Sequence, residues 1–165
     1  MRNDPFIHLP LYQKGVPGRP TWSTASFITL FTCAHLPLLG RLSAGSLQLS
    51  QSGTLSVNCW RSLPARFPDV RLDVLACLPD HMDVILLFAQ TDSAYPDSPV
   101  STVIDWFQAA TTKQFRQWGL GRLRYAAERH LWQQRYHERP IRDEAHLMAV
   151  RRYIRRQPAR WAPYH

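Results

Sequence analysis

The hydrophobic positions of the chain alternate with polar ones in some segments and recur at helical spacing in others. Three segments rich in β-branched and aromatic residues are predicted to be strands: residues 26–32, 70–78 and 83–89. The last of them is apolar at nearly every position, which is typical of a strand buried on both faces. We therefore expect residues 70–78 and 83–89 to be neighbours in the centre of one sheet.

Three other segments carry apolar residues at helical spacing. The first runs from about residue 54 to the prolines at 64–68, and the second covers residues 101–118. The third begins at residue 142, with the carboxylates of Asp143 and Glu144 in its first turn, where they complement the helix dipole. Pro158 is expected to end this helix after Gln157.

Two segments are marked by proline. Residues 1–25 contain four prolines and two glycines, which predicts an irregular N-terminal arm followed by a single domain over residues 26–165. Near the C-terminus, the segment Leu131–Tyr136 precedes Pro140, and this proline confines any strand there to a sheet edge.

The amino-acid composition indicates which class of protein this is. A chain of 165 residues that is 45% hydrophobic is long enough to form one core. The three cysteines are widely spaced and form no CxxC pair, which indicates free thiols in a reducing compartment. The sequence has no apolar run long enough to span a bilayer and no secretory signal at its start, so we expect a cytoplasmic protein with no membrane partner.

The net charge of +8 is confined to one part of the chain. Residues 1–100 contain as many basic as acidic groups, whereas residues 101–165 contain 13 of the 20 basic groups and 5 of the 12 acidic ones. A basic segment of this kind suits a polyanion, because each phosphate that it neutralises releases counterions. A solvated basic helix explains the charge about equally well.

Two pairs of residues have spacings that could serve chemistry. His81 and Asp83 lie two positions apart in a strand-like segment, so both side chains project from the same face. Tyr153 and Gln157 lie four positions apart, one turn along one face of the last helix. An imidazole, a carboxylate and an amide oxygen could hold a divalent cation beside a tyrosine nucleophile. Spacing alone is weak evidence, because a chain with 7 His and 6 Tyr offers such pairs by chance.

Three segments, in this order, resemble a known family. They are Leu78–Leu87 (LPDHMDVILL), Leu131–Tyr136 with Ile141–Glu144 (LWQQRY and IRDE), and Arg151–Trp161 (RRYIRRQPARW). They are similar to blocks of the single-tyrosine HUH transposases, in which two histidines flank a hydrophobic residue, and most similar to the REP-associated tyrosine transposase branch. The resemblance extends from about Phe27 to Trp161.

The resemblance implies an α+β fold, with an antiparallel sheet of ferredoxin-like or RRM-like topology and packed helices. It implies nicking and strand transfer on single-stranded DNA, including DNA hairpins, through a 5′-phosphotyrosine intermediate. The nucleophile would be Tyr153, and His81, Asp83 and Gln157 would hold Mg²⁺ or Mn²⁺ against the scissile phosphate. Tyr136 is a competing nucleophile, but its position beside Trp132 favours a packing role.

The basic residues around Tyr153 would then contact DNA, and a monomer or a homodimer is compatible with this reading. The expected DNA-binding residues are Arg135, Arg142, Arg151, Arg152, Arg155, Arg156 and Arg160.

Asp83 stands where the family has its second histidine. A carboxylate is a competent ligand for Mg²⁺ or Mn²⁺, but it also adds a negative charge that faces the phosphate. A second hypothesis is therefore a DNA-binding protein on the same scaffold that has lost catalysis. An RNA-binding protein is a third, less favoured reading, because it would need exposed aromatic residues on the central strands and residues 70–78 have none.

Overall fold

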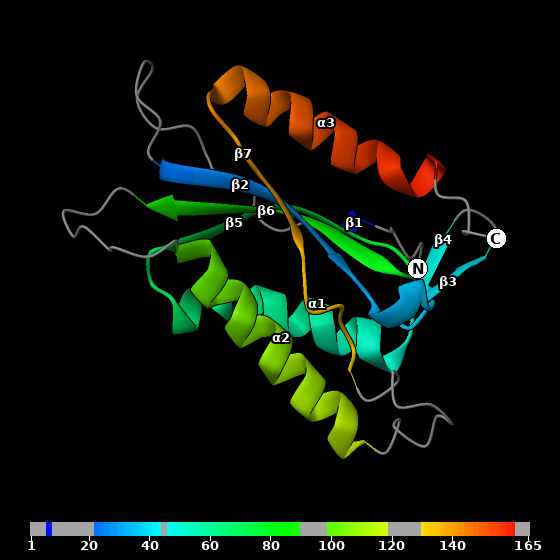
Figure 1. Cartoon of the computed structure of the whole chain (residues 1–165). Helices are drawn as coiled ribbons and strands as arrows, with labels where there is room; N and C mark the ends of the chain where they lie inside the picture. The colour runs from blue at the N-terminus through cyan, green and yellow to red at the C-terminus, as the bar shows by residue number, and fades with distance from the viewer. Residues whose placement is uncertain (1–5, 8–21, 44–45, 90–98, 119–129, 161–165) are drawn as a thin grey trace.

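The main sheet has five strands in the order β1-β5-β6-β2-β7, and every neighbouring pair is antiparallel (Figure 1). The computed structural model describes residues 6–7, 22–43, 46–89, 99–118 and 130–160, without the side chains of residues 6, 7, 99 and 158–160. The predicted α+β class with an antiparallel sheet is confirmed.

The strands of the main sheet are β1 (Phe6–Ile7), β2 (Trp22–Phe31), β5 (Val70–Cys77), β6 (His81–Ala89) and β7 (His137–Pro140). The hairpin β3 (Gly40–Ser43) and β4 (Ser46–Leu49) forms a second, two-stranded sheet. The helices are η1 (Cys33–His35), α1 (Gln51–Arg66), α2 (Pro99–Gln117) and α3 (Glu144–Arg160).

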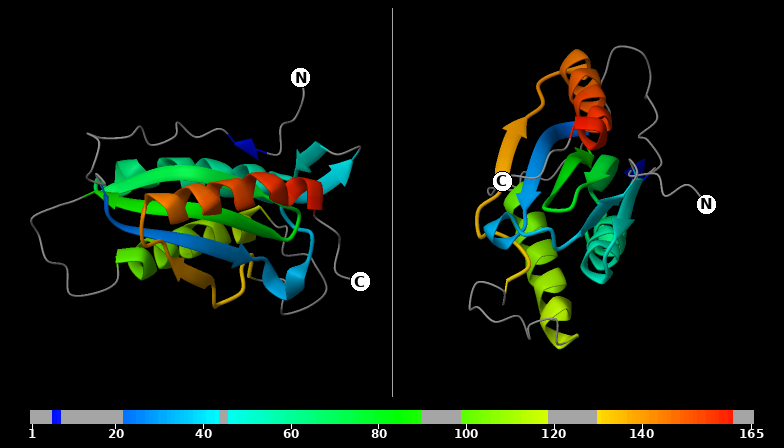
Figure 2. Two further views of the ribbon diagram at one scale, coloured as in Figure 1. Left: turned by 90° about the horizontal axis from the view of Figure 1, so that it is seen from above. Right: turned by 90° about the vertical axis from the view of Figure 1, so that its right-hand side faces the viewer.

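Helices cover both faces of the sheet. The helices α1 and α2 lie on one face and α3 lies on the other, as Figures 1 and 2 show. The central strand β6 divides its apolar residues between the two layers: Val84 and Leu86 pack in the core under α1 and α2, while Ile85 and Leu87 pack in the core under α3. His81 and Asp83 share the alternation of Ile85, so they belong to the face that α3 covers.

Aromatic packing and a close backbone contact fix the α1 and α2 layer. The Trp60 ring lies edge-on to Phe107, 5.2 Å between centroids, and the Trp132 indole donates a hydrogen bond to the Thr111 hydroxyl at 2.8 Å. Gly53, in the first turn of α1, lies against the backbone of Leu39. A Cβ atom at position 53 would come within 1.9 Å of the Leu39 carbonyl oxygen, so this approach requires glycine.

The sheet contains more of the N-terminal segment than the sequence predicts. The expected strand at residues 26–32 begins at Trp22, whose side chain is buried and whose backbone pairs with Ala89 of β6. Residues 6–7 also pair with β5. The composition of residues 1–25 predicts an irregular arm because proline and glycine disfavour local order, but pairing with distant strands overrides this preference in residues 6–7 and 22–25.

Near the C-terminus, the prediction for Pro140 is confirmed and the predicted end of the last helix is wrong. Residues 131–136 form only a single bridge, between Trp132 and Thr32, and the strand that follows them, β7, lies at the edge of the sheet and ends on Pro140, as predicted. The last helix continues through Pro158 to Arg160. Pro158 lies two residues before the end of α3, so it removes a single backbone hydrogen bond, the one that an N–H at this position would donate to the Ile154 carbonyl oxygen. None of the described helices combines the length and the apolar composition needed to cross a bilayer.

Candidate active site

The candidate site lies on the sheet face under α3, along three alternate positions of β2. Phe27, Thr29 and Phe31 share this face, and the register with β6 sets Thr29 opposite Asp83 and Phe31 opposite His81. On the other side of β2, Thr29 lies opposite His137 of β7. Antiparallel pairing therefore collects polar side chains from three strands around Thr29 and Phe31.

The Asp83 carboxylate is buried, with 2% of its surface exposed. Its Oδ1 atom accepts a hydrogen bond of 2.6 Å from the Thr29 hydroxyl. Burial raises the pKa of Asp83, and the proximity of Asp80 adds to this rise, whereas His81 and the Thr29 hydrogen bond oppose it. The charged form of Asp83 is therefore costly in the protein alone, and a nearby cation would stabilise it.

The imidazole of His81 is oriented by the neighbouring carboxylate. His81 Nδ1 lies 2.7 Å from Asp80 Oδ1, and because an ionised carboxylate only accepts hydrogen bonds, Nδ1 carries the proton. In the neutral ring this leaves the lone pair of Nε2 directed away from Asp80. His81 Nε2 lies 3.9 Å from Asp83 Oδ2, the carboxylate oxygen that Thr29 does not engage.

The donor chemistry of this pair fits a divalent cation. A neutral imidazole nitrogen and a carboxylate oxygen lie close together on one face, and both are ordinary metal ligands. A second carboxylate that fixes the histidine tautomer is a common partner of metal-binding histidines. The structure thus brings together two of the three predicted ligands, His81 and Asp83.

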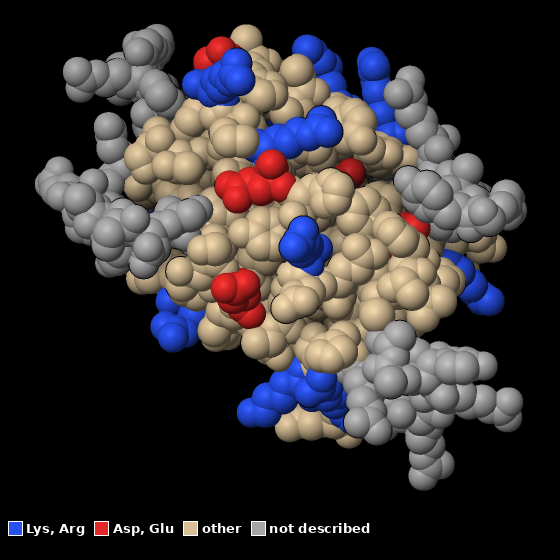
Figure 3. Space-filling view, in the orientation of Figure 1, with Lys and Arg blue, Asp and Glu red and all other residues tan. Residues whose placement is uncertain are grey.

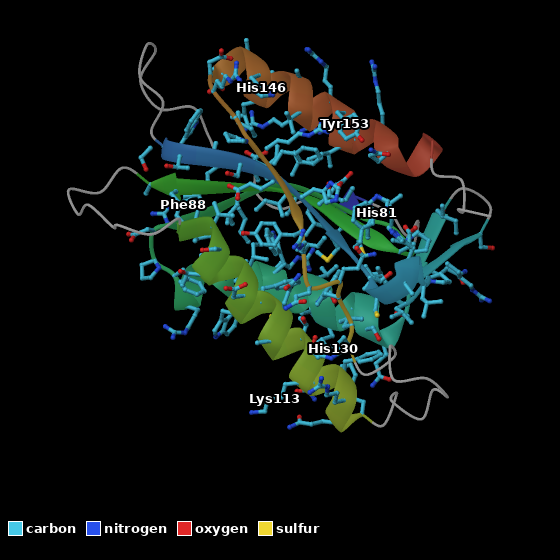
Figure 4. The ribbon with its side chains drawn as sticks, in the orientation of Figure 1. His81, Phe88, Lys113, His130, His146 and Tyr153 are labelled. Carbon is cyan, nitrogen blue, oxygen red and sulfur yellow. The ribbon has the colours of Figure 1, made fainter. Side chains whose placement is uncertain are left out.

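The other predicted groups lie on α3. The Tyr153 side chain is 49% exposed, and its ring packs edge-on against Phe27 with 5.7 Å between centroids. Figure 4 shows Tyr153 on α3 and His81 beneath the C-terminal half of that helix. Gln157 is half-buried and lies one turn beyond Tyr153. Within the described residues, no hydrogen bond links Gln157 to His81 or Asp83, so its role as a ligand stays a prediction.

Arg151, one of the residues predicted to contact DNA, is buried and paired with an acidic residue. The residue is 8% exposed, and its guanidinium forms a bidentate ion pair with the buried Asp73 of β5, through Nε at 2.9 Å and Nη2 at 2.5 Å. The hydrogen bonds to Asp73 raise the pKa of Arg151 and keep it charged. Asp73 also accepts a hydrogen bond from the backbone N–H of Val74, beside an irregularity in β5. The pair fastens α3 to the sheet two residues before Tyr153.

The remaining arginines expected to bind DNA are exposed where their side chains are described. Arg152, Arg155 and Arg156 are exposed on α3, and Figure 3 shows basic side chains along this part of the surface. Arg135 and Arg142 are exposed before and after β7. The side chain of Arg160 lies outside the described part of the chain. The exposure of these side chains permits the predicted DNA contacts and does not test them.

Tyr136 occupies the opposite side of the sheet from Tyr153. It is half-buried and packs against the core under α1 and α2. Burial raises its pKa, and the negative charges of Glu138 and Asp105 raise it further. This environment suits a packing role and disfavours a phenolate nucleophile.

Thr29, Asp73 and Asp80 are site residues that sequence reasoning missed. Asp80 stands beside His81 in the segment LPDHMD, so its position was visible, but its hydrogen bond was not. Alternation could have placed Thr29 on the same face as Phe27. Nothing local in the sequence sets Thr29 opposite Asp83, because that contact joins positions 54 residues apart.

The sequence matches a family model and a known protein. Residues 69–157 match the family model described as "Transposase IS200 like". An uncharacterised protein of Haemophilus influenzae is 26% identical over 144 residues, which cover 82% of this chain and 80% of that protein.

Two solved structures share the fold. A REP-associated tyrosine transposase bound to a REP hairpin has a TM-score of 0.58 and 15% identity, covering 90% of this chain and 74% of its own. A candidate transposase of Deinococcus radiodurans has a TM-score of 0.53 and 14% identity, covering 86% and 95%. The family match includes the strand that carries His81 and Asp83 and most of the helix that carries Tyr153, and it spans more than half of the sequence. The chain therefore belongs to the family of IS200-like transposases.

Proposed function

We propose that the protein nicks single-stranded DNA and transfers the strand through a covalent link to Tyr153. The observation that carries the proposal is the His81–Asp83 pair, which lies on the sheet face covered by the helix of Tyr153. In the step we propose, the Tyr153 oxygen forms a bond to phosphorus and the bond from phosphorus to the 3′ oxygen breaks. The products are a 5′-phosphotyrosine and a 3′-hydroxyl, and the reverse attack by a 3′-hydroxyl rejoins a strand.

His81 Nε2 and Asp83 Oδ2 would hold Mg²⁺ or Mn²⁺, with the side-chain oxygen of Gln157 as a third ligand. When bound, the cation polarises a phosphoryl oxygen and screens its charge as the tyrosine approaches. Asp80 and Thr29 would support this role from outside the ligand set, because each hydrogen-bonds to one of the two ligands and fixes its orientation.

The exposure of Tyr153 suits a nucleophile that must meet a polymer. Its hydroxyl can release a proton to solvent, and the leaving 3′ oxygen can take one up from solvent. The exposed guanidinium groups of Arg152, Arg155 and Arg156 would neutralise the phosphates on either side of the attacked one. A DNA hairpin is the favoured substrate, because the similar REP-associated transposase was solved with a REP hairpin.

The proposal is tested by transfer of a DNA label to the protein. The substrate is a pool of DNA hairpins with randomised single-stranded flanks, labelled at the 3′ end or the 5′ end and incubated with Mn²⁺. We expect a covalent adduct that carries the 3′ label, because the tyrosine keeps the 5′-phosphate of the downstream fragment. The 5′ label should appear only in shortened free DNA, and EDTA should abolish both products. An adduct that carries the 5′ label would contradict the proposal.

The second candidate function is DNA binding without cleavage, favoured by the buried carboxylate of Asp83 in place of a histidine. It predicts binding to the same hairpins that weakens steeply with salt, and no adduct in the presence of Mn²⁺. The Asp83→His variant would then be expected to form the adduct. Cleavage by the unmodified protein rules this candidate out.

The cost of burying Asp83 leads to a stability prediction. Asp83→Asn keeps the acceptor for Thr29 and removes the charge, so the metal-free variant should have a melting temperature a few degrees above that of the unmodified protein. Because the pKa of Asp83 is raised in the folded state, its contribution to stability rises as the pH falls through that pKa, so acidification should reduce the difference in melting temperature between the two proteins.

Addition of Mn²⁺ provides the matched comparison, measured by thermal denaturation. The cation should raise the melting temperature of the unmodified protein and have little effect on Asp83→Asn, because a bound ligand stabilises only the form that binds it. Equal shifts in the two proteins would mean that Asp83 does not hold the cation.

A further inference from the structure

Phe31, at the end of β2, is surrounded by three histidines from different elements. Its ring centroid lies 4.8 Å from that of His35 in η1, 5.3 Å from that of His81 in β6 and 5.5 Å from that of His137 in β7. The rings of His35 and His137 are edge-on to Phe31, and both residues are exposed. We call Phe31, His35 and His137 the Phe31 cluster. The family match begins at residue 69, so it does not include Phe31 or His35.

The backbone that carries His35 is strained. Ala34 and His35 both have φ of 53°, in the left-handed region that residues with a side chain seldom adopt. The turn is held by hydrogen bonds from His35 N to the Thr32 carbonyl oxygen and from the Thr32 hydroxyl to the Leu36 carbonyl oxygen. Strain of this kind persists where the surroundings over-determine it and is common at binding sites. Here it directs the imidazole of His35 to the Phe31 ring.

The Phe31 cluster is next to the proposed cleavage site. Phe31 is the register partner of His81, and His137 is the partner of Thr29, which hydrogen-bonds to Asp83. A strand whose phosphate reaches His81 and Asp83 therefore has its neighbouring base within reach of the two exposed imidazoles. Aromatic side chains at such positions bind single-stranded DNA by stacking, which tolerates any base because every base has a π-face.

We propose that the Phe31 cluster binds the nucleobase that flanks the scissile phosphate, with the rings of His35 and His137 as the stacking surface. The proposal rests on the proposed function in one respect, namely that single-stranded DNA is the substrate. It adds a contact to a base, whereas the arginines of α3 would contact phosphates. This contact positions the strand and does not select a sequence.

The test compares two probes in EDTA, so that it is independent of cleavage. They are a short oligo(dT) and an abasic oligomer of the same length, and fluorescence anisotropy gives the dissociation constant of each. The double variant His35→Asn, His137→Thr removes both rings. Asn tolerates the left-handed conformation at position 35, and Thr suits a strand at position 137. We expect about a tenfold loss of affinity for oligo(dT) and no change for the abasic oligomer.

Three further measurements complete the test. His130→Asn removes an exposed imidazole that lies away from His81 in Figure 4, and it should leave both affinities unchanged. His137→Tyr should retain the affinity for oligo(dT), because it retains a stacking ring. The slope of affinity against salt should be the same in the double variant and the unmodified protein, because stacking releases no counterions.

The proposal is overturned if the double variant loses affinity for both probes equally, which would indicate phosphate contacts, or for neither. Its failure is distinguishable from that of the nicking proposal. If no adduct forms but the double variant loses affinity for oligo(dT) alone, only the nicking proposal fails. If the adduct forms but the double variant shows no selective loss of affinity for oligo(dT), only the base-stacking proposal fails.

Discussion

Replacement of Tyr153 by phenylalanine is expected to remove the covalent DNA adduct, a loss on the order of a thousandfold or more. The attacking oxygen is the only atom deleted, and without it no bond to phosphorus can form. The fold should be unaffected, because the side chain is half exposed and its ring contact with Phe27 does not involve the hydroxyl. The measurement is label transfer from a 3′-labelled hairpin in Mn²⁺, with hairpin affinity measured in EDTA.

Tyr136→Phe is the matched control for this experiment. It deletes the same atom from a half-buried tyrosine that packs on the opposite side of the sheet. We expect the adduct to form at the level of the unmodified protein. An adduct that persists in Tyr153→Phe and disappears in Tyr136→Phe would reassign the nucleophile.

Arg151→Met is expected to lower the free energy of unfolding by about 3–5 kcal/mol, because it leaves the buried carboxylate of Asp73 without its partner. Methionine keeps much of the length of the arginine and removes its charge and hydrogen bonds. Urea denaturation monitored by circular dichroism measures the loss. Replacing both partners, as in Arg151→Met with Asp73→Val, should restore part of the stability, because no unpaired charge then remains buried.

Arg152→Met provides the control at the neighbouring exposed position. It should change the stability by less than about 0.5 kcal/mol and should weaken hairpin binding with a smaller dependence on salt. Arg151→Met, measured where it is folded, should keep the salt dependence of the unmodified protein. Equal stability of the two variants would show that the ion pair with Asp73 contributes nothing.

The parts of the fold that follow from local pattern are predictable from sequence. The continuous apolar run of β6 indicates burial on both faces, and the structure confirms it by dividing Val84 and Ile85 between two cores. The apolar stripe around Trp60 and the prolines that follow it predict α1 with its end near Arg66. The addition of Trp22 to β2 depends on a partner strand 67 residues away in sequence, which no local pattern contains.

In the candidate site too, some features follow from local sequence spacing and others depend on contacts between distant residues. Spacing within a strand places His81 and Asp83 on one face of that strand, and spacing within a helix places Tyr153 and Gln157 on one face of that helix. Charge alone treats Arg151 and Arg152 as equivalent, although the structure buries one and exposes the other. Their different roles follow from the position of Asp73, a lone acidic residue inside a strand whose partner cannot be identified without the three-dimensional fold.

Because β6 lies between two cores, the residues that it carries open less easily than those on α3. His81 and Asp83 are carried by a strand whose two faces are both covered, so separating them requires the loss of both cores and thus global unfolding. Tyr153 is carried by a helix that packs against one core only. A local opening that lifts this helix would take the tyrosine, together with any strand attached to it, away from the two ligands without dismantling them. The two proposed ligands on β6 therefore last as long as the fold, whereas the helix that carries Tyr153 and the third proposed ligand, Gln157, can open locally.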